Sequence, residues 1–500
     1  MAKTDSYVVT LELELTPEHE KYLRRCENVV REIENGCKRL CEIRYRGLRS
    51  DPRWRPAAAR FGELHEKKKK TAEEKAELEL AQITMGKLKR KFRLTEYQHH
   101  EDAAEMRSHF GKTISINEAQ KAATRAFQAF ERLRKGEAHR LNFKRRGTPV
   151  TIENKSNSFG FREKDGKLLG MYGFAAKFRI DSKDFLAQDT FKDRTKYVRI
   201  YRREIRGRWR WFCQLVKEGT PRRKPKTAVG RSSHPVGCDQ GPSSIAAIVA
   251  ATHEALIAPL PTGVNEREEK RIHHEQKVAD RALRLNNPDC FDEKNNWIKG
   301  KKAVKSKTYE RRQARARDLR RKQVVRRTQE ANKLSKRLIA MGVDIRTEDH
   351  GFKSMAARSK ETTINKKNGK INSKKRFGSS IRRHAPAAFR STTAQKLAAM
   401  TLPSGERAKL GLVRTEKVKA SQLDPLTGEY RKKKLSERWT EVGGRLVQRD
   451  LLSAFILAHT TGEKLDTVDL EACRRDWSAF LVAHDAAIKA ADKKSLKGVM

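Results

Sequence analysis

The first residues alternate apolar and polar side chains, and the pattern then changes to a helical spacing. Residues Tyr7 to Leu15 (YVVTLELEL) are rich in β-prone residues and alternate in part, which predicts a strand. From about Pro17 to Gly136 apolar residues recur three and four positions apart, as on one face of a helix. The clearest helix starts at Ser115, because Ser115 and Glu118 form a capping box ahead of its apolar face.

Short β-prone runs follow between Leu141 and Lys217 and predict a small sheet or barrel. Three of them, at Ala176–Ile180, Tyr197–Tyr201 and Trp209–Val216, are separated by Gly, Asn and Asp. Because a strand also precedes the helices, we expect that strand to complete this sheet, with the helical block inserted into it. The segment from Pro221 to Pro235 combines Pro, Gly and Ser with little apolar content, which predicts a linker.

An α/β pattern occupies the rest of the chain. Apolar runs at Val236–Asp239 and Ile245–Ala251 predict two strands joined by a Gly turn, and Val343–Thr347 predicts a third. A long basic helical region lies before the third strand, and an apolar helix follows Asp450. The predicted fold class is α/β with several domains, because 500 residues exceed the usual size of one domain.

The charge balance adds a partner to this picture. Lys and Arg number 113 against 63 Asp and Glu, which gives a formal net charge of +50 spread along the chain. Nucleic acid fits this distribution better than a membrane surface, which attracts basic residues clustered beside an anchor. No apolar leader follows Met1 and no apolar run approaches the roughly 18 residues of a membrane span. Seven scattered cysteines without a CxxC pair predict no disulfide framework and are typical of a reducing, cytoplasmic setting.

Three acidic residues end or follow apolar segments, and each is a candidate metal ligand. Asp239 precedes a Gly turn, Glu348 ends a short strand, and Asp450 opens the apolar helix. Each alone has an ordinary structural explanation, as a turn residue, a solvated strand end or an acid at a helix N-terminus. Together they supply the carboxylates on rigid elements that two-metal hydrolysis of a phosphodiester requires. We expect all three to be catalytic and to bind Mg²⁺ or Mn²⁺, the cations that hard oxygen ligands favour.

The segments around these acids resemble the three RuvC motifs of TnpB nucleases and compact type V CRISPR effectors. GCDQGPSSIAAIV is similar to the first motif, IRTEDHGFKSM to the second and LVQRDLLSAFILA to the third. INEAQKAATRAFQAFERLRKG followed by LNFKRRG resembles the segment that precedes the RuvC domain in TnpB-like proteins. The resemblance covers most of residues 115–460. It implies an RNA-guided DNA endonuclease with a single RuvC active site, a CRISPR-type defence effector of prokaryotic cytoplasm whose partners are a guide RNA and target DNA.

The resemblance also implies a RuvC-like RNase H fold and an N-terminal oligonucleotide-binding β-barrel (the wedge barrel) interrupted by a helical recognition lobe. Boundaries drawn from composition agree with that layout. The implied parts are the first barrel strand (1–16), the recognition lobe (17–137), the rest of the barrel (138–218), a linker (219–234), the RuvC domain with motifs I and II (235–415), a target-nucleic-acid-binding module (416–447) and the RuvC C-terminal part with motif III (448–500).

The module at 416–447 departs from the family pattern in one respect. TnpB-like proteins usually carry two Cys pairs there that bind zinc, whereas this segment has no cysteine and no His cluster in their place. We therefore expect no zinc, and a small sheet that folds by packing alone or leans on the RuvC body.

Two basic segments are candidate nucleic-acid surfaces. Between Lys301 and Arg337 sixteen of 37 positions are Lys or Arg and three are acidic, without Pro or Gly, which predicts a cationic helix that lines phosphates. Between Lys353 and Arg383 eleven residues are basic and one is acidic, which predicts either a lid over the cleft or a disordered insert. Because Arg suits bidentate phosphate contact, the proposed nucleic-acid-binding residues are Arg311, Arg312, Arg315, Arg320, Arg321 and Arg327.

Several other functions fit part of this pattern. A transposon-associated TnpB-like guided nuclease differs mainly in origin, and the missing cysteines favour the CRISPR effector slightly. A guided DNA-binding repressor with little cleavage would not need all three acids. A structural RNA-binding protein would leave the acids unexplained, and a guide-free RuvC resolvase would leave the large helical block unexplained.

Overall fold

The computed structural model places the chain in two compact units, residues 1–222 and 223–500. The described residues are 5–67, 70–220, 234–250, 254–293, 295–349, 351–357, 364, 378–400, 402, 408–433 and 437–491. Most of the predicted linker, residues 221–233, lies outside them. Among the described helices, none is both long enough and apolar enough to span a membrane.

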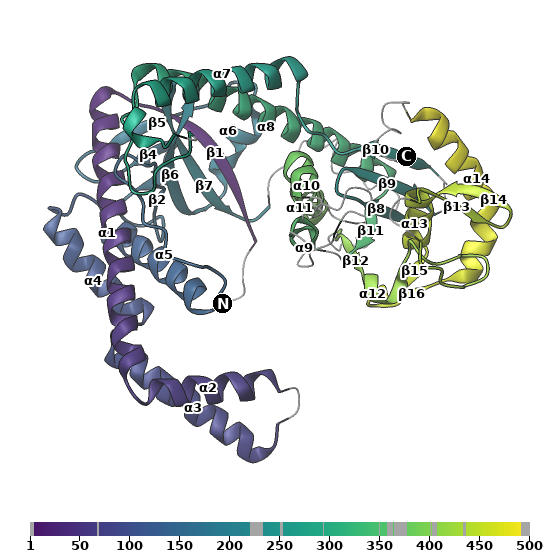
Figure 1. Cartoon of the computed structure of the whole chain (residues 1–500), viewed down its shortest axis with the longest axis horizontal. Helices are drawn as coiled ribbons and strands as arrows, with labels where there is room; N and C mark the ends of the chain where they lie inside the picture. The colour runs from purple at the N-terminus through teal and green to yellow at the C-terminus, as the bar shows by residue number, and fades with distance from the viewer. Residues whose placement is uncertain are drawn as a thin grey trace. The chain divides into compact units, whose positions relative to one another are not determined.

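The first unit contains a curled seven-stranded sheet (Figure 1). β1 (Ser6–Glu14) pairs antiparallel with β7 (Arg208–Glu218) on one side and with β5 (Ala175–Arg179) on the other. The strand that precedes the helices is therefore central to a sheet whose other strands follow them. The full order is β2 (Ile152–Glu153), β6 (Thr195–Ile205), β7, β1, β5, β4 (Lys167–Leu169) and β3 (Arg162–Lys164).

The two ends of this sheet, β2 and β3, do not pair with each other among the described strands. β3 nevertheless contacts β6, the strand beside β2, so the sheet curls until its ends lie close together without being closed by hydrogen bonds, which is intermediate between the predicted sheet and the predicted barrel. A short helix, α6 (Phe185–Asp189), and the turn η1 (Thr190–Lys192) connect β5 to β6.

Helices α1 (Pro17–Ser50) and α5 (Ile116–Arg134) of the first unit cover one face of this sheet, whereas α2 (Trp54–Glu66) and α3 (Ala72–Lys91) pack away from it. Leu11, Val198 and Leu215 of the sheet share one buried cluster with Val30 and Ala123 of the helices. The helix predicted at Ser115 has the expected capping box, because the Ser115 N–H donates to the Glu118 carboxylate at 2.6 Å and the Ser115 hydroxyl accepts from the Glu118 N–H. Helix α4 (Glu96–His109) also lies between β1 and β2 in the chain.

The second unit contains a five-stranded sheet in the order β10-β9-β8-β11-β12. β8 (Pro235–Gln240), β9 (Ser244–Val249) and β10 (Ala255–Pro259) form an antiparallel meander. β11 (Asp344–Glu348) runs parallel to β8, and β12 (Gly411–Val413) runs parallel to β11. The sequence predicts β8, β9 and β11 to within two residues at each end.

Helices cover both faces of this sheet, so the unit has three layers. Successive residues of β9 point to opposite faces. Ile248 belongs to the buried cluster that contains α13 (Arg449–Ala458) and α14 (Leu470–Ala490). Ile245 belongs to the cluster that contains the end of α8 and Phe389 of α11 (Pro386–Ala398). Smaller elements are η3 (Pro288–Cys290), α9 (Phe352–Ala356), α10 (Gly378–His384), α12 (Thr415–Val418), β15 (Thr460–Thr461) and β16 (Thr467–Val468).

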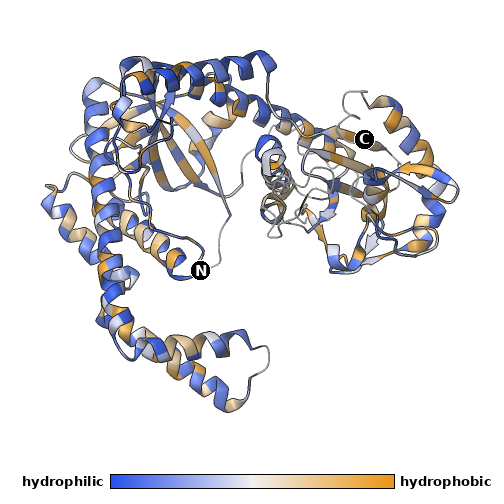
Figure 2. Ribbon diagram, viewed as in Figure 1, coloured by the Kyte–Doolittle hydropathy of each residue, from blue (hydrophilic) through white to orange (hydrophobic). Residues whose placement is uncertain are grey.

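The cationic helix begins later than the sequence predicts. α8 spans Lys307–Met341 and packs against α7 (Glu266–Leu285), and both helices are largely hydrophilic in Figure 2. A helical start at Lys301 is therefore wrong, because the Ser306 hydroxyl accepts from the Tyr309 N–H and caps the helix there.

The described part of the segment 416–447 includes most of α12 and nearly all of the hairpin of β13 (Trp439–Val442) and β14 (Arg445–Gln448). Val418, Leu423 and Val442 are buried in the same cluster as α13 and α14. The segment therefore leans on the sheet-bearing body of the second unit, which is one of the two outcomes expected without zinc.

Candidate active site

Two neighbouring parallel strands bring Asp239 and Glu348 side by side. Thr347 of β11 lies opposite Cys238 of β8, so the next residue on each strand occupies an equivalent position. Adjacent strands lie roughly 4.8 Å apart, and equivalent positions present their side chains to the same face. Both acids therefore stand at the carboxyl end of the sheet, where α/β folds collect their functional groups.

The third acid comes from α13, which approaches β8 at a glycine. A Cβ on Gly237 would lie 1.8 Å from the Ala454 carbonyl oxygen and 2.4 Å from the Ala458 nitrogen. Only a residue without a side chain permits this contact between strand and helix backbone. The helix itself starts because the Gln448 side chain accepts from the Leu451 N–H at 2.7 Å, which places Asp450 in the first turn.

The pKa of Asp239 is raised by burial and by the two other acids. Burial raises the pKa of Asp239 well above the ordinary Asp value, and the negative charges of Asp450 and Glu348 raise it further. The residue as a whole is partly accessible, but its carboxyl group lies deep enough for desolvation to dominate. Arg449 and the Ser453 hydroxyl oppose the rise. The Ser453 oxygen is buried without a partner at hydrogen-bond distance among the described residues, so its interaction with Asp239 is a long one.

Two arginines that sequence reasoning missed lie against Asp450. One carboxylate oxygen is 3.8 Å from Nη1 of Arg438, and the other is 3.7 Å from Nε of Arg449. The Arg449 N–H donates to the Arg438 carbonyl at 2.9 Å, which holds the two residues together at the open end of the β13–β14 hairpin. The sequence gives little sign of the contact between Arg438 and Asp450, because Arg438 lies twelve residues earlier, in a segment that is interpreted only from its missing cysteines.

The donor set suits a hard divalent cation. Three clustered carboxylates repel one another, and a cation bound to their oxygens would relieve that repulsion. Within the described ranges, no group of three or more His, Cys, Asp or Glu side chains stands in metal-binding geometry. At Asp450 the guanidinium groups of Arg438 and Arg449 supply the positive charge instead. The carboxylates thus match Mg²⁺ or Mn²⁺ in the chemistry of their oxygens, but in this structure they do not surround a common cation position.

We expect Asp239→Asn to stabilise the metal-free protein at neutral pH. The pKa of Asp239 is higher in the folded protein than in the unfolded chain, so ionisation of this group lowers stability as the pH rises above the unfolded value of about 4. Each unit by which folding raises the pKa of Asp239 lowers the free energy of unfolding at neutral pH by about 1.4 kcal/mol. The variant lacks this loss, so its advantage in stability disappears below about pH 4, where Asp239 is protonated in both states. Urea unfolding in EDTA between pH 4 and pH 8 measures this.

Asp344→Asn is the control for this measurement, because Asp344 pairs with Arg346 at 2.7 Å and its loss should not stabilise. Equal or lower stability of Asp239→Asn at pH 7 would show that Asp239 is not buried among like charges.

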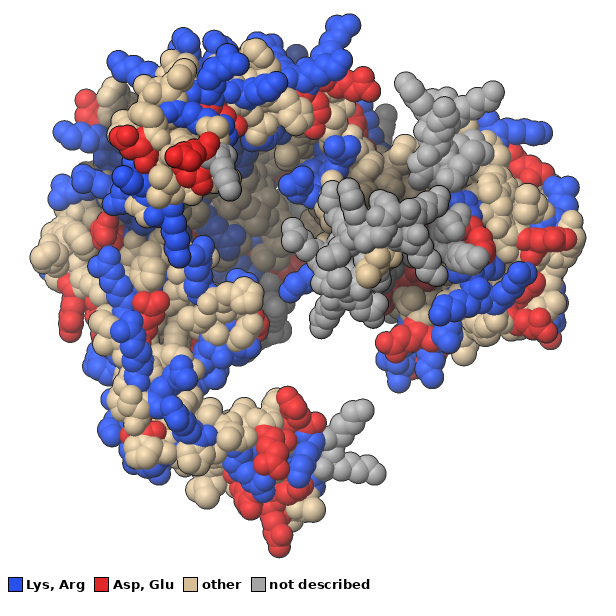
Figure 3. Space-filling view, viewed as in Figure 1, with Lys and Arg blue, Asp and Glu red and all other residues tan. Residues whose placement is uncertain are grey.

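The six proposed arginines of α8 divide into exposed and internally paired groups. Figure 3 shows Lys and Arg side chains gathered over α7 and α8. Arg312 lies 3.2 Å from the buried Glu275 of α7, and Arg321 lies 2.8 Å from Asp318. Arg327 donates to two backbone carbonyls of α10. The exposed members are Arg311, Arg315 and Arg320.

The exposed arginines are therefore available to phosphates, although Arg315 also lies 3.9 Å from Glu275. Of the basic stretch 353–383, the structure describes α9, Ala357, Ile364 and α10 up to Arg383. Residues 358–363 and 365–377, on which the choice between a lid and a disordered insert falls, lie outside the described residues.

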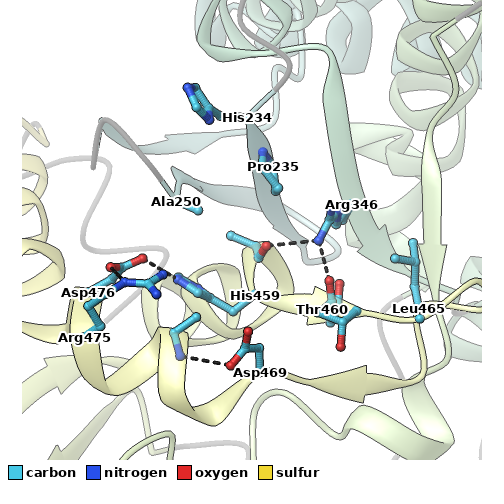
Figure 4. A pocket seen from close by; sticks show the side chains of 14 residues that line it. His234, Pro235, Ala250, Arg346, His459, Thr460, Leu465, Asp469, Arg475 and Asp476 are labelled. Carbon is cyan, nitrogen blue, oxygen red and sulfur yellow. Dashed lines mark hydrogen bonds and ion pairs between the residues drawn. The ribbon is translucent and has the colours of Figure 1, made fainter.

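A cavity of about 600 Å³ lies at the opposite end of the same sheet (Figure 4). Its lining includes Pro235, where β8 begins, and its polar groups bind one another. His459 bridges the Phe455 carbonyl at 2.8 Å and Asp476 at 3.0 Å, while Arg346 binds the Ala458 carbonyl at 3.2 Å. Because these groups are already satisfied and lie away from the three acids, the cavity is not the candidate active site.

Comparison with known proteins gives structural neighbours only. No protein-family model and no curated protein match the sequence. One similar solved structure is a complex of Cas12f1 with sgRNA and target DNA, at 10% identity and a TM-score of 0.40, covering 91% of this chain and 99% of that one. Another is a CRISPR–Cas12f ternary complex, at 13% identity and a TM-score of 0.23, covering 91% of this chain and 87% of that one. Both of these solved structures are Cas12f complexes.

Proposed function

We propose that this chain is a metal-dependent, RNA-guided endonuclease that hydrolyses phosphodiester bonds of target DNA at Asp239, Glu348 and Asp450. The observation that carries the proposal is the convergence of these acids. They come from three distant parts of the sequence, yet the register of β8 and β11 sets Asp239 beside Glu348, and the contact of α13 with Gly237 brings Asp450 near both. A structural role for each acid alone, in a turn, a strand end or a helix start, does not require that they meet.

The sheet order supports a RuvC-like RNase H fold for the second unit. Three antiparallel strands come first in the chain, and two later strands add in parallel beside the first of them. This arrangement places the ends of β8 and β11 at one edge, where the RuvC resemblance assigns the first two catalytic acids. Helix α13 supplies the third, as the resemblance assigns to the last motif.

In the proposed reaction the three acids and Arg438 have separate roles. Asp239, Glu348 and Asp450 would hold Mg²⁺ or Mn²⁺, which when bound would supply Lewis acidity toward a phosphate oxygen and lower the pKa of a bound water. The strand ends and the first turn of α13 fix these carboxylates in position. Arg438 is about one-third exposed and presents its guanidinium beside Asp450, where an oxygen of a phosphodiester can accept from it.

A bound guide RNA would supply sequence recognition by base pairing. The net charge of +50 and the exposed arginines of α8 can hold guide and target backbones, because phosphate neutralisation drives such binding. We extend to this chain the partners of the similar Cas12f1 complex, sgRNA and target DNA. A prokaryotic cytoplasm is the proposed setting.

A guided DNA-binding repressor is the second candidate. The pairing of Asp450 with Arg438 and Arg449 favours it, because guanidinium groups that stay on the carboxylate would keep a cation away. Cleavage of guide-matched DNA in Mg²⁺ separates the two functions. The repressor binds the matched DNA and leaves it intact.

We expect guide RNA to convert weak, non-specific DNA binding into discrimination by complementarity. Without guide, the protein should bind duplex DNA with a steep salt dependence and no sequence preference. RNA that co-purifies with the protein should contain a constant and a variable part, and its addition should direct cleavage to matching DNA. A guide-free preparation that cuts one duplex site at a rate unchanged by added RNA would contradict the guided model and favour a stand-alone RuvC nuclease.

A further inference from the structure

A cavity of about 550 Å³ lies between α7, α8 and α10 of the second unit. We call it the arginine pocket. Its described lining contains no Phe, Tyr or Trp and carries several cationic groups against a single carboxylate. The charged lining residues and the histidine are Arg320, Arg327, Arg382, Arg383, His273 and Glu269.

The walls of the arginine pocket are held by short contacts. Gly263 has a φ of +64°, and a Cβ there would lie 2.2 Å from the Gln323 carbonyl, so the chain before α7 rests directly on α8. Arg327 of α8 donates to the carbonyls of Arg382 at 3.2 Å and Arg383 at 3.0 Å. These bonds fix the end of α10 against α8, so the pocket does not depend on a ligand to form.

The remaining cations point to a ligand. Arg327 is committed to the carbonyls, and Glu269 accepts from Gln323 at 3.4 Å. Arg320, Arg382 and Arg383 are exposed, and none has a carboxylate partner within the described part of the chain. Three unpaired guanidinium groups around one hollow repel one another, and an anion that accepts hydrogen bonds from them removes this repulsion.

The arginine pocket is also tied to the edge of the sheet that carries the acids. Gln240, next to Asp239, donates to the Pro386 carbonyl at 2.7 Å, two residues after α10 ends. Arg390 of α11 donates to the Glu348 carbonyl at 3.2 Å. The segment that forms one wall of the pocket therefore continues directly into contacts with both acidic strands.

We propose that the arginine pocket binds the phosphates of a single nucleic-acid strand and leads that strand to the sheet edge of Asp239 and Glu348. Its role in delivering substrate rests on the proposed nuclease function, but the binding itself does not. Cavities of roughly 300–1,000 Å³ enclose drug-sized ligands, and a nucleotide is about as large as such a ligand. A nucleotide of a single strand therefore fits the arginine pocket, whereas a duplex is too wide to enter it. Because no aromatic platform lines it, the pocket recognises backbone and not base sequence.

The first test measures affinity of the full chain for labelled 12-residue single strands of DNA and of RNA in EDTA. Replacing Arg320, Arg382 and Arg383 with Gln should weaken binding at least tenfold. It should also lower the slope of log K against log salt by about 2, since each single-strand phosphate contact contributes about 0.7. Arg327 is kept, because it holds α10. The matched control replaces Arg267, Lys270 and Arg271 with Gln together, three exposed positions of α7 outside the pocket.

The second test locates the strand. All seven cysteines are buried, so Cys introduced at the exposed Ser379 in the pocket lining would be the accessible thiol for a photo-crosslinker. Crosslinks to the single strand should form from Ser379→Cys and be several-fold fewer from Lys270→Cys on α7. A DNA strand, an RNA strand and a blunt duplex are compared in turn. Equal crosslinking of duplex and single strand would overturn the single-strand assignment.

The outcomes separate this inference from the proposed function. If the triple variant binds single strands as tightly as the control variant, the pocket proposal is wrong, whether or not the protein cleaves DNA. If the triple variant loses binding while the unaltered protein with its guide does not cleave, the pocket stands as a binding site and the nuclease function fails.

Discussion

Asp239→Ala, Glu348→Ala and Asp450→Ala should each reduce Mg²⁺-dependent cleavage of guide-matched DNA by roughly 10³-fold or more, because a metal ligand carries several kcal/mol of transition-state stabilisation. Binding of guide and target should persist, since each change removes negative charge and leaves the arginines of α8 in place. Single-turnover cleavage and a parallel binding measurement check both parts.

Asp349→Ala is the matched control for these variants. Asp349 follows Glu348 directly, is exposed, and donates its N–H to the Val413 carbonyl at 2.9 Å. It lies one position beyond the residue that shares a register with Asp239, so its carboxylate should not be needed. Near-normal cleavage by one of the three variants would show that this residue is wrongly assigned, and near-normal cleavage by all three would remove the proposed active site.

Gly237→Ala should destabilise the second unit by about 3 kcal/mol, the upper end of what overpacking costs. The added methyl group would lie 1.8 Å from the Ala454 carbonyl oxygen, and backbone cannot turn away as a flexible side chain can. Helix α13 must therefore move off β8, which also carries Asp450 away from Asp239. Thermal unfolding measures the stability loss, and hydrogen exchange should locate it in β8, β9 and α13.

Gly241→Ala tests whether any glycine near the acids behaves in this way. A Cβ at Gly241 would lie 3.6 Å from its nearest neighbours, an ordinary contact, so this variant should unfold close to the temperature of the unaltered protein. Hydrogen exchange of β6 and β7 in the first unit should be unchanged in both variants. If Gly237→Ala were as stable as Gly241→Ala, the backbone of α13 would not contact Gly237 of β8 this closely.

The sequence predicts the individual elements well, because their signals are local. β1, β8, β9 and β11 follow from alternation or from apolar runs, and α5 follows from the Ser115–Glu118 capping box. The start of α8 is wrong by six residues, because composition without Pro or Gly permits a helix but does not say where capping begins it. The Ser306 hydroxyl decides that point.

Which arginines are exposed could not be predicted from their number. Net charge and spacing along α8 treat Arg312 and Arg320 alike, yet Arg312 is paired with Glu275 of another helix and Arg320 faces the arginine pocket. The partner lies 37 residues earlier in the chain, and only the packing of α7 against α8 brings the two together. Likewise the sequence shows that the segment 416–447 lacks cysteines, but only the structure shows that Val418, Leu423 and Val442 of this segment are buried in the cluster of α13 and α14.

The sequence by itself determines that the chain is strongly cationic and which segments form helices and strands. It also determines that three acids lie at the ends or starts of these elements. Those properties depend on neighbouring residues and on composition. Which groups meet depends instead on tertiary packing. The parallel register of β8 and β11 sets Asp239 beside Glu348, and the bare backbone of Gly237 admits α13 with Asp450. Arg449 precedes Asp450 directly in the chain, whereas Arg438 lies twelve residues earlier and reaches Asp450 only because the β13–β14 hairpin folds it back beside Arg449.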